Sequence, residues 1–259
     1  MEVIIKDTPE DCARAGGGII AKAMKKKPNY VLGFATGSTP VPLYEDLISR
    51  YEAGEIDFSA AASFNLDEYI GLAPDHPCSY RRFMQEKLFD KVNLRPENTN
   101  IPNGLAQDIK AECLSYELAI RAVGGIDLQI LGIGTDGHIA FNEPGSSLGS
   151  RTRIKTLTAK TREDNARFFE SLPDVPRHCI TMGVGTIMEC ERLLLFAFGE
   201  GKAEIIAKAV EGPVTAMVPA SALQLHRDVK IILDEPAASA LKLRDYYKEV
   251  FEFKPDWQR

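Results

Sequence analysis

The sequence lacks several features that would assign it to large classes of proteins. Hydrophobic residues make up 44% of its 259 residues, but no run reaches the roughly 18 apolar residues expected of a membrane-spanning helix. The N-terminal segment MEVIIKDTPED has neither a basic start nor a long apolar core, so no secretory signal peptide is expected. These absences predict a globular chain that has no membrane partner.

Positive charge is also scarce. The chain has 31 Lys and Arg residues against 37 Asp and Glu, which gives a formal net charge of −6. Nucleic-acid binders normally carry a basic face, so no nucleic-acid partner is expected. A small anionic substrate is still allowed, because a few local cations and helix N-termini can hold a phosphate on an acidic protein.

Cysteine and histidine are few and show no paired spacing. The five cysteines include no C-x-x-C pair, which favours free thiols in a reducing, cytoplasmic compartment over a disulfide framework. The four histidines form no H-E-x-x-H motif or clustered ligand spacing. No metal is therefore expected.

Short apolar runs alternate with helical patterns along the whole chain. Many of the runs are continuously apolar, as in strands that are buried on both faces of a parallel sheet. Strands are expected near residue 4 and over 30–36, 61–67, 126–134, 179–184, 192–199 and 229–235. The alternation predicts a single-domain, three-layer α/β/α fold with a mostly parallel, doubly wound, Rossmann-like sheet.

The expected helices show recognisable ends and one local conflict. Thr8-Pro9 and Thr39-Pro40 each place a capping residue before a proline, and the helices over 108–123 and 201–212 end in glycine. Three successive glycines, 16–18, fall inside the first helix, where each costs up to about 1 kcal/mol relative to alanine. Close packing against a neighbouring element would explain them.

Polar motifs follow four of the expected strands, at the sheet edge where parallel sheets bind their ligands. Thr36, Gly37, Ser38 and Thr39 follow the second strand, and they suit either an anion such as phosphate or an ordinary N-cap loop. Asp67 ends the third strand. It is either a turn former or, shielded from water in the crevice, a general base with a raised pKa.

The segment GIGTDGHIAFNEP follows the fourth strand and contains the dinucleotide-binding spacing G-x-G-x-x-G, at Gly132, Gly134 and Gly137. A dinucleotide site needs a helix after the third glycine and an acidic ribose partner about 20 residues further on. Here Pro144 and Gly145 cut the helix short, and the later region is basic. The glycines therefore indicate a catalytic loop, and no NAD is expected.

The same loop carries Asp136, His138 and Glu143. A histidine flanked by two acids at the mouth of a sheet is expected to act as an acid or base whose pKa the carboxylates raise. A structural histidine and a metal ligand are the alternatives, and the lack of further ligand spacing makes metal binding the weaker of the two.

Four blocks of the sequence together resemble glucosamine-6-phosphate deaminase. They are TGSTP (36–40), FNLDEY (64–69), GTDGHIAFNEP (134–144) and SRTRIKT (150–156). The likeness covers nearly the whole chain and fades toward the C-terminus. DGHIAFNEP is specific to this family, whereas TGSTP also fits its relative, 6-phosphogluconolactonase. The resemblance implies conversion of glucosamine 6-phosphate and water into fructose 6-phosphate and ammonia, without an organic cofactor.

The resemblance also implies roles for individual residues. His138 would move a proton at the ring oxygen to open the pyranose, while Asp136 and Glu143 orient it. Asp67 would carry a proton from C2 to C1 through an enolamine. The phosphate of this small-molecule sugar phosphate would be held by Thr36, Gly37, Ser38, Thr39, Arg167 and Lys202.

Regulation differs within the family. In its hexameric members, the positions matching Ser146, Arg153, Lys155 and Thr156 bind N-acetylglucosamine 6-phosphate at a subunit interface; other members are monomeric and unregulated. The oligomeric state of this chain stays open, and a solvated basic strand is the alternative interpretation of the four residues. The segment near 157–180 matches the family's lid, with decoration as its alternative.

Two other functions compete with the deaminase. A lactonase acting on a phosphorylated sugar acid shares the fold and the phosphate loop, but it needs no base at Asp67 for transfer between C2 and C1. A sugar-phosphate-sensing domain would need a helix-turn-helix segment. It would also have no reason to retain Asp67, Asp136, His138 and Glu143 together.

Overall fold

The computed structural model describes residues 1–255 and confirms the expected alternation of strands and helices. The strands are β1 (Glu2–Lys6), β2 (Val31–Phe34), β3 (Ala62–Asn65), β4 (Asp67–Tyr69), β5 (Thr99–Asn100), β6 (Leu128–Leu131), β7 (Arg153–Thr156), β8 (His178–Thr181), β9 (Leu193–Ala197) and β10 (Val229–Asp234). The helices are α1 (Pro9–Lys26), α2 (Val41–Glu52), α3 (Tyr80–Lys87), α4 (Ile109–Ala122), α5 (Ala159–Asn165), α6 (Val184–Met188), α7 (Ala203–Val210) and α8 (Arg244–Glu252).

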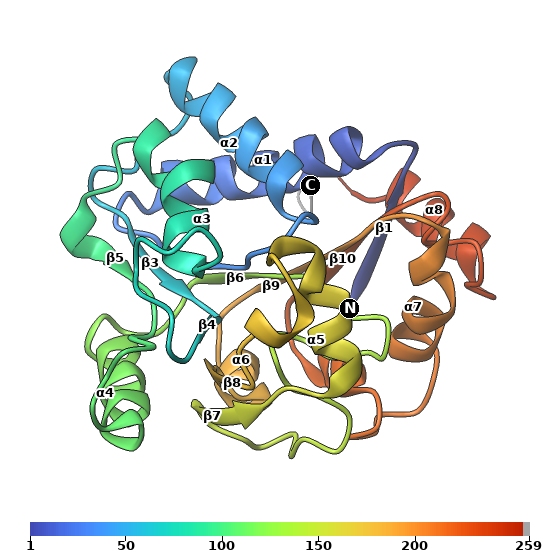
Figure 1. Ribbon diagram of the computed structural model, residues 1–259. Coiled ribbons are helices and arrows are strands. Elements are labelled where there is room, and N and C mark those ends of the chain that lie inside the picture. Colours follow the sequence, from blue (N-terminus) through green and yellow to red (C-terminus); the bar gives the residue numbers. More distant parts are fainter. Residues whose placement is uncertain (256–259) are drawn as a thin grey trace.

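A seven-stranded sheet forms the centre of the molecule, with the strand order β1-β10-β9-β6-β2-β3-β5. Every pair of neighbours in it is parallel. Strands β2, β6 and β9 are buried along their whole length, which explains their continuously apolar sequences. Helices α1, α2 and α3 lie on one side of the sheet and α4 and α6 on the other (Figure 1). The predicted three-layer fold is therefore confirmed.

The strand expected over 179–184 exists as β8 but lies outside the central sheet. It is the middle strand of a small antiparallel sheet, β4-β8-β7, in which Asp67 and Arg153 both lie opposite Thr181. Part of the basic stretch after residue 150 is thus the edge strand β7. An apolar strand sequence shows that the strand is buried, but it does not show which partner covers it.

The order of the strands creates a crevice between β2 and β6. From β2 the chain adds β3 and β5 on one side, and it then returns to place β6 and β9 on the other side. Such a reversal is the usual place for a ligand, because the loops that follow the two central strands diverge. The motifs at 36–39 and 132–138 follow these two strands.

The glycines inside α1 allow close packing, as expected. A Cβ atom at Gly16 would lie 2.5 Å from the ring of Phe196 on β9, and one at Gly17 would lie 1.7 Å from a carboxylate oxygen of Asp46 on α2. The predicted start of this helix is also confirmed, because the Thr8 hydroxyl accepts a hydrogen bond of 3.1 Å from the Asp11 N–H.

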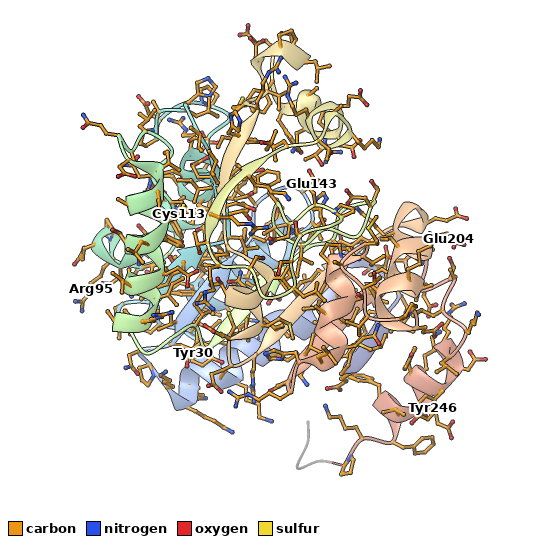
Figure 2. The ribbon with its side chains drawn as sticks, turned by 90° about the horizontal axis from the view of Figure 1, so that it is seen from below. Tyr30, Arg95, Cys113, Glu143, Glu204 and Tyr246 are labelled. Carbon is orange, nitrogen blue, oxygen red and sulfur yellow. The ribbon has the colours of Figure 1, made fainter. Side chains whose placement is uncertain are left out.

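All five cysteines are free thiols, and four of them are buried. Figure 2 shows Cys113 on α4 at one side of the molecule, Glu204 and Tyr246 at the other, and Glu143 between them. In the chain up to residue 255, no helix combines the length and the apolar character needed to cross a membrane.

Candidate active site

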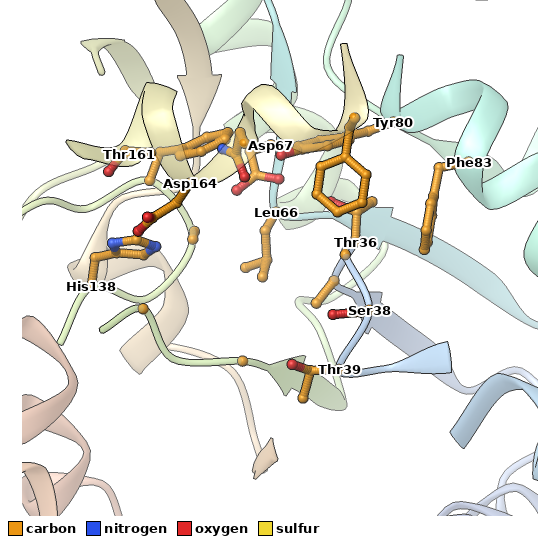
Figure 3. Close-up of a pocket in the computed structure, with 18 of the residues that line it drawn as sticks. Thr36, Ser38, Thr39, Leu66, Asp67, Tyr80, Phe83, His138, Thr161 and Asp164 are labelled. Atoms are coloured by element: carbon orange, nitrogen blue, oxygen red, sulfur yellow. The ribbon is translucent and has the colours of Figure 1, made fainter. Parts of the chain in front are cut away.

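A cavity of about 600 Å³ opens at the carboxyl ends of β2 and β6. Its lining includes Asp67, His138, the loop 36–39, Arg167 and Lys202. Figure 3 shows Asp67 and His138 directed into this space, with Ser38 and Thr39 on another wall. The structure therefore brings together the predicted catalytic and phosphate-binding segments, although they lie far apart in the sequence.

The loop at 36–39 leaves the start of helix α2 open. The expectation that Thr39 caps this helix is wrong: the cap position is Pro40, and no side-chain hydrogen bond closes the helix start. Gly37 has a φ of 94°, a left-handed conformation that suits glycine. An uncapped helix start directs backbone N–H groups at whatever lies before it, and this arrangement suits an anion.

Two cations face the same part of the cavity. The Lys202 ammonium donates a hydrogen bond of 2.7 Å to the Ile133 carbonyl, and burial lowers the pKa of this side chain. The Arg167 guanidinium lies 4.7 Å from the centre of the Phe168 ring. These two side chains add positive charge to a lining that also includes the carboxylate of Asp164.

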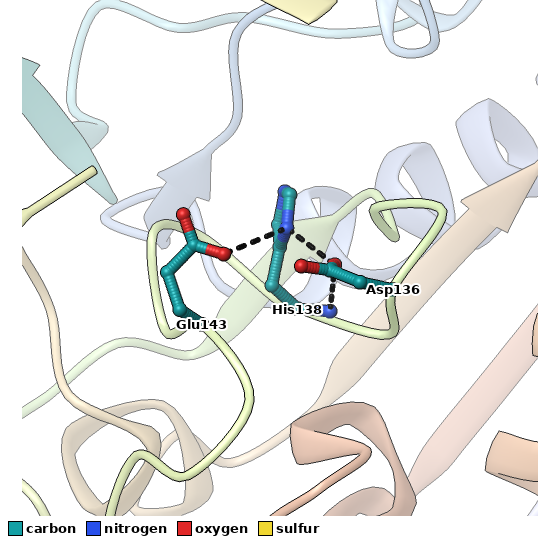
Figure 4. Close-up of side chains that lie close together, drawn as sticks. All are labelled: Asp136, His138 and Glu143. Atoms are coloured by element: carbon teal, nitrogen blue, oxygen red, sulfur yellow. Dashed lines mark hydrogen bonds and ion pairs between the residues drawn. The ribbon is translucent and has the colours of Figure 1, made fainter. Parts of the chain in front are cut away.

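His138 lies between two carboxylates (Figure 4). Its Nδ1 is 2.7 Å from Oδ1 of Asp136 and 3.9 Å from Oε2 of Glu143. The Asp136 carboxylate also accepts a hydrogen bond from the His138 backbone N–H at 3.1 Å. Burial raises the pKa of Asp136, but the contacts with the His138 ring, the His138 backbone N–H and Glu143 together outweigh burial, so that the net pKa is lowered.

The glycine spacing around His138 serves the loop itself. A Cβ atom at Gly134 would lie 2.2 Å from the His138 ring, so that only glycine leaves room for the imidazole. Gly137 has a φ of 90°, and the loop also holds Ala140 at a φ of 49°, which is rare for a residue with a side chain. No helix follows Gly137 before residue 144. The dinucleotide-like spacing therefore belongs to a histidine loop.

Asp67 is the first residue of β4 and is almost completely buried. Burial raises its pKa well above the ordinary aspartate value, and the neighbouring charge of Glu68 raises it further. A carboxylate of this kind is a stronger base than an exposed one. Its position on the cavity wall makes the base accessible to a bound molecule.

Glu143 connects His138 with the segment 157–180. Its Oε1 accepts a hydrogen bond of 2.7 Å from the Thr161 hydroxyl and longer bonds from the N–H and hydroxyl of Thr158. Both threonines belong to the start of α5, and Thr158 caps that helix. The carboxylate beside the histidine is thus held by a segment that also lines the cavity.

The same three side chains have the chemistry of a metal site. Asp136, His138 and Glu143 each offer one ligand atom, and these atoms lie within 4.8 Å of one another. The absence of a metal requirement stays a prediction.

Several residues that line the cavity were not predicted from the sequence. Tyr80 and Phe83 come from α3, and Asp164 and Phe169 come from the segment 157–180. Tyr69, which ends β4, packs against the rings of Tyr80 and Phe169. These elements fold over the crevice from outside the central sheet, so the strand-end pattern gives no signal for them.

The candidate allosteric residues lie apart from this cavity. Ser146 is buried, while Arg153, Lys155 and Thr156 lie on β7. The Arg153 guanidinium donates a hydrogen bond of 2.9 Å to the side-chain carbonyl of Asn142, the residue before Glu143. Arg153 also lines a second cavity of about 350 Å³ beside α4.

One known protein family matches most of this chain. The family model described as glucosamine-6-phosphate isomerases/6-phosphogluconolactonase matches residues 7–232. The chain belongs to this family. Within the family, it is 54% identical to a glucosamine-6-phosphate deaminase of Mycolicibacterium smegmatis over 100% of this chain and 99% of the relative. It is likewise 54% identical to one of Hahella chejuensis over 96% and 95% of the two chains.

Solved structures separate the two branches of the isomerase/lactonase family. A monomeric glucosamine-6-phosphate deaminase superposes with a TM-score of 0.91 at 43% identity, over 93% of this chain and 100% of its own. A 6-phosphogluconolactonase from Trypanosoma cruzi reaches a TM-score of 0.75 at 18% identity, over 93% and 97% of the two chains. The second likeness shows the fold alone, whereas the sequence resemblance to the deaminases is confirmed.

Proposed function

We propose that the protein converts glucosamine 6-phosphate and water into fructose 6-phosphate and ammonia. The observation that carries this proposal is a buried carboxylate, Asp67, and a histidine held by two acids, His138, in one cavity with an uncapped helix start. Full-length relatives that are named glucosamine-6-phosphate deaminase support the same substrate. The chemistry is an aldose–ketose isomerisation followed by loss of ammonia, so "isomerase" describes it better than "hydrolase".

Ring opening is the first step. The Asp136 carboxylate lies 2.7 Å from Nδ1 of His138, and we infer that Nε2 moves a proton between the hydroxyl at C1 and the ring oxygen of the sugar. Breaking the bond between C1 and the ring oxygen yields the open-chain aldehyde. Glu143, at 3.9 Å from the same Nδ1, orients the ring from the other side.

Isomerisation follows on the open chain. Asp67 takes the proton from C2, an enolamine forms, and the same carboxyl group returns the proton to C1. The resulting ketose imine adds water at C2 and releases ammonia as the carbonyl forms. Its raised pKa makes Asp67 a better base for this carbon-bound proton than an ordinary aspartate.

The phosphate is bound at the other end of the cavity. Thr36, Gly37, Ser38 and Thr39 offer hydroxyl and N–H donors, and Arg167 and Lys202 offer charge. Binding energy at this remote group holds C2 in register with Asp67, where small misplacements are costly. Arg167 lies on the segment 157–180, and we propose that this segment is a lid that closes when the phosphate is bound.

We further propose that Ser146, Arg153, Lys155 and Thr156 bind N-acetylglucosamine 6-phosphate if the chain assembles as a hexamer. The contact from Arg153 to Asn142 gives such a site a direct link to the loop of Glu143. A relative whose structure is described as monomeric makes the monomer the other assembly to consider. Residues 256–259, at the end of the C-terminal segment where the family likeness fades, lie outside the described residues.

The proposed reaction takes place in the cytoplasm, the compartment that the free thiols favour. The test is formation of fructose 6-phosphate and ammonia from glucosamine 6-phosphate by the purified protein, with 6-phosphogluconolactone as the competing substrate. We expect turnover of the amino sugar without added NAD or metal, and an unchanged rate in EDTA. Hydrolysis of the lactone alone would contradict the deaminase, and a strict need for a divalent ion would contradict the metal-free mechanism.

A further inference from the structure

Glu68, the residue after the proposed base, is a buried carboxylate that does not line the cavity. Its Oε1 accepts hydrogen bonds of 2.9 Å from the N–H groups of Tyr69 and Tyr80, and its Oε2 accepts one of 3.0 Å from the N–H of Arg81. Tyr80 and Arg81 are the first two residues of helix α3. Glu68 thus ties strand β4 to the start of this helix by its side chain.

Helix α3 forms a wall of the cavity. Figure 3 shows Tyr80 and Phe83 of this helix on the same side of the space as Asp67. The Tyr80 ring stacks on Phe141 of the histidine loop, with the ring planes 12° apart. The position of α3 relative to β4 therefore sets the space between Asp67 and the aromatic wall.

Glu68 pairs N–H groups at the start of α3 that the cap residue does not reach. Ser79 is the cap residue, and its hydroxyl accepts a hydrogen bond of 3.1 Å from the N–H of Arg82 alone. Burying a carboxylate is costly unless its acceptors are satisfied, and the raised pKa of Glu68 reflects this burial. Three N–H donors and the positive end of the helix dipole offset that cost.

We propose that Glu68 is a positioning residue of the reaction: it clamps α3 against β4 so that Asp67 faces C2 of a substrate held below Tyr80. This inference rests on the proposed function. Glu68 does not contact the substrate. It acts through its carboxylate, which accepts hydrogen bonds from backbone N–H groups of β4 and α3.

Glu68 differs in charge from the other titratable groups that surround Asp67. These are Tyr69 on β4, Tyr80 on α3, Tyr116 on α4, Cys179 on β8 and, across the cavity, His138. Burial raises the pKa of the three tyrosines and of the cysteine, so these four are neutral at physiological pH. The negative charge that acts on Asp67 from its own strand is that of Glu68.

The experiment compares Glu68→Gln, Glu68→Asp and Ser79→Ala in the full chain, with kcat and KM for glucosamine 6-phosphate measured across pH. For Glu68→Gln we expect kcat to fall by roughly 10- to 100-fold, as for small misplacements of reacting groups. KM should change little, because the phosphate is bound elsewhere. The acid limb of the kcat/KM profile should move to lower pH, because the carboxylate of Asp67 loses a negative neighbour.

The two other variants separate positioning from structure. Glu68→Asp keeps the charge but is too short to reach α3, so it should keep the acid limb and lose rate. Ser79→Ala loosens the same helix without a change of charge, so it should leave the acid limb in place. A Glu68→Gln protein with normal kcat and profile would overturn the inference, as would the same profile shift in Ser79→Ala.

Failure to fold is read from circular dichroism. If Glu68→Gln does not fold, the activity of Glu68→Asp is the test. Full activity of that variant would overturn the proposed positioning role of Glu68. Wild-type protein that forms no fructose 6-phosphate would overturn the proposed function and this inference with it. If the wild type is active and the Glu68 variants have normal kcat and pH profiles, the inference alone is overturned.

Discussion

At the scale of single residues, the site depends on where the structure buries charge. Asp67 is buried beside a second carboxylate and has a raised pKa, whereas Asp136 is half-buried against an imidazole and has a lowered one. Two aspartates of the same intrinsic acidity are thus driven in opposite directions by their surroundings. The first suits proton abstraction from carbon, and the second suits the orientation of a histidine.

The division of labour can be tested by replacing Asp67 with Asn, which keeps the size of the side chain but removes the base. Turnover should fall by about 10²-fold or more, in line with the loss of a general base. Binding of the sugar phosphate should change much less. The measurement is exchange of the C2 hydrogen with deuterated water, and exchange at the normal rate would show that another group is the base.

The same substitution should stabilise the protein. Because the folded-state pKa of Asp67 is raised above the ordinary value of 3.8, its stabilising contribution is complete below that value and is lost as pH rises through the raised pKa. At pH 7, Asp67→Asn should therefore have the higher Tm, where each kcal/mol corresponds to roughly 2–4 °C. Thermal melts at pH 7 and pH 5 measure this difference, and a gap that fails to narrow at pH 5 contradicts the assignment.

At the scale of elements, the fold joins the histidine loop to the start of α5. Thr161 of that helix holds Glu143 by a hydrogen bond of 2.7 Å, while the contacts of Thr158 to the same carboxylate are 3.3 Å or longer. A segment that is proposed to move over the substrate thus contacts a side chain next to His138. Movement of α5 would alter the position of Glu143 beside His138 through these hydrogen bonds, of which that from Thr161 is the shortest.

Thr161→Val keeps the shape of the side chain and removes that bond. A hydrogen bond to a charged group contributes about 1.5–3 kcal/mol, so kcat should fall by about tenfold or more. The matched control is Thr99→Val, whose hydroxyl donates to the Pro96 carbonyl on a different part of the fold. Steady-state kinetics of the two variants check the prediction, and equal kcat values would mean that the bond to Glu143 is dispensable.

At the scale of the whole molecule, the site lies where the order of strands reverses, and the assembly state decides what else binds. If light scattering shows a hexamer, N-acetylglucosamine 6-phosphate should lower the half-saturating concentration of substrate. Arg153→Ala and Lys155→Ala should each abolish this effect. A hexamer with hyperbolic kinetics that the effector leaves unchanged would mean that the basic residues of β7 are structural.

Local sequence determined much of this protein by itself. Apolar runs that suit strands covered on both faces, helix starts such as Thr8-Pro9, and polar motifs after the strands are all set by neighbouring residues, and they predicted the fold and the cavity. The tertiary structure alone decided which strands pair, because an apolar sequence that predicts burial of β8 does not determine which strands lie beside it. The contacts of Glu68 with α3 and of Thr161 with Glu143 join elements that are separate in the sequence. No local pattern encodes such contacts, because they arise only when the packed layers bring distant backbone and side chains within hydrogen-bonding distance.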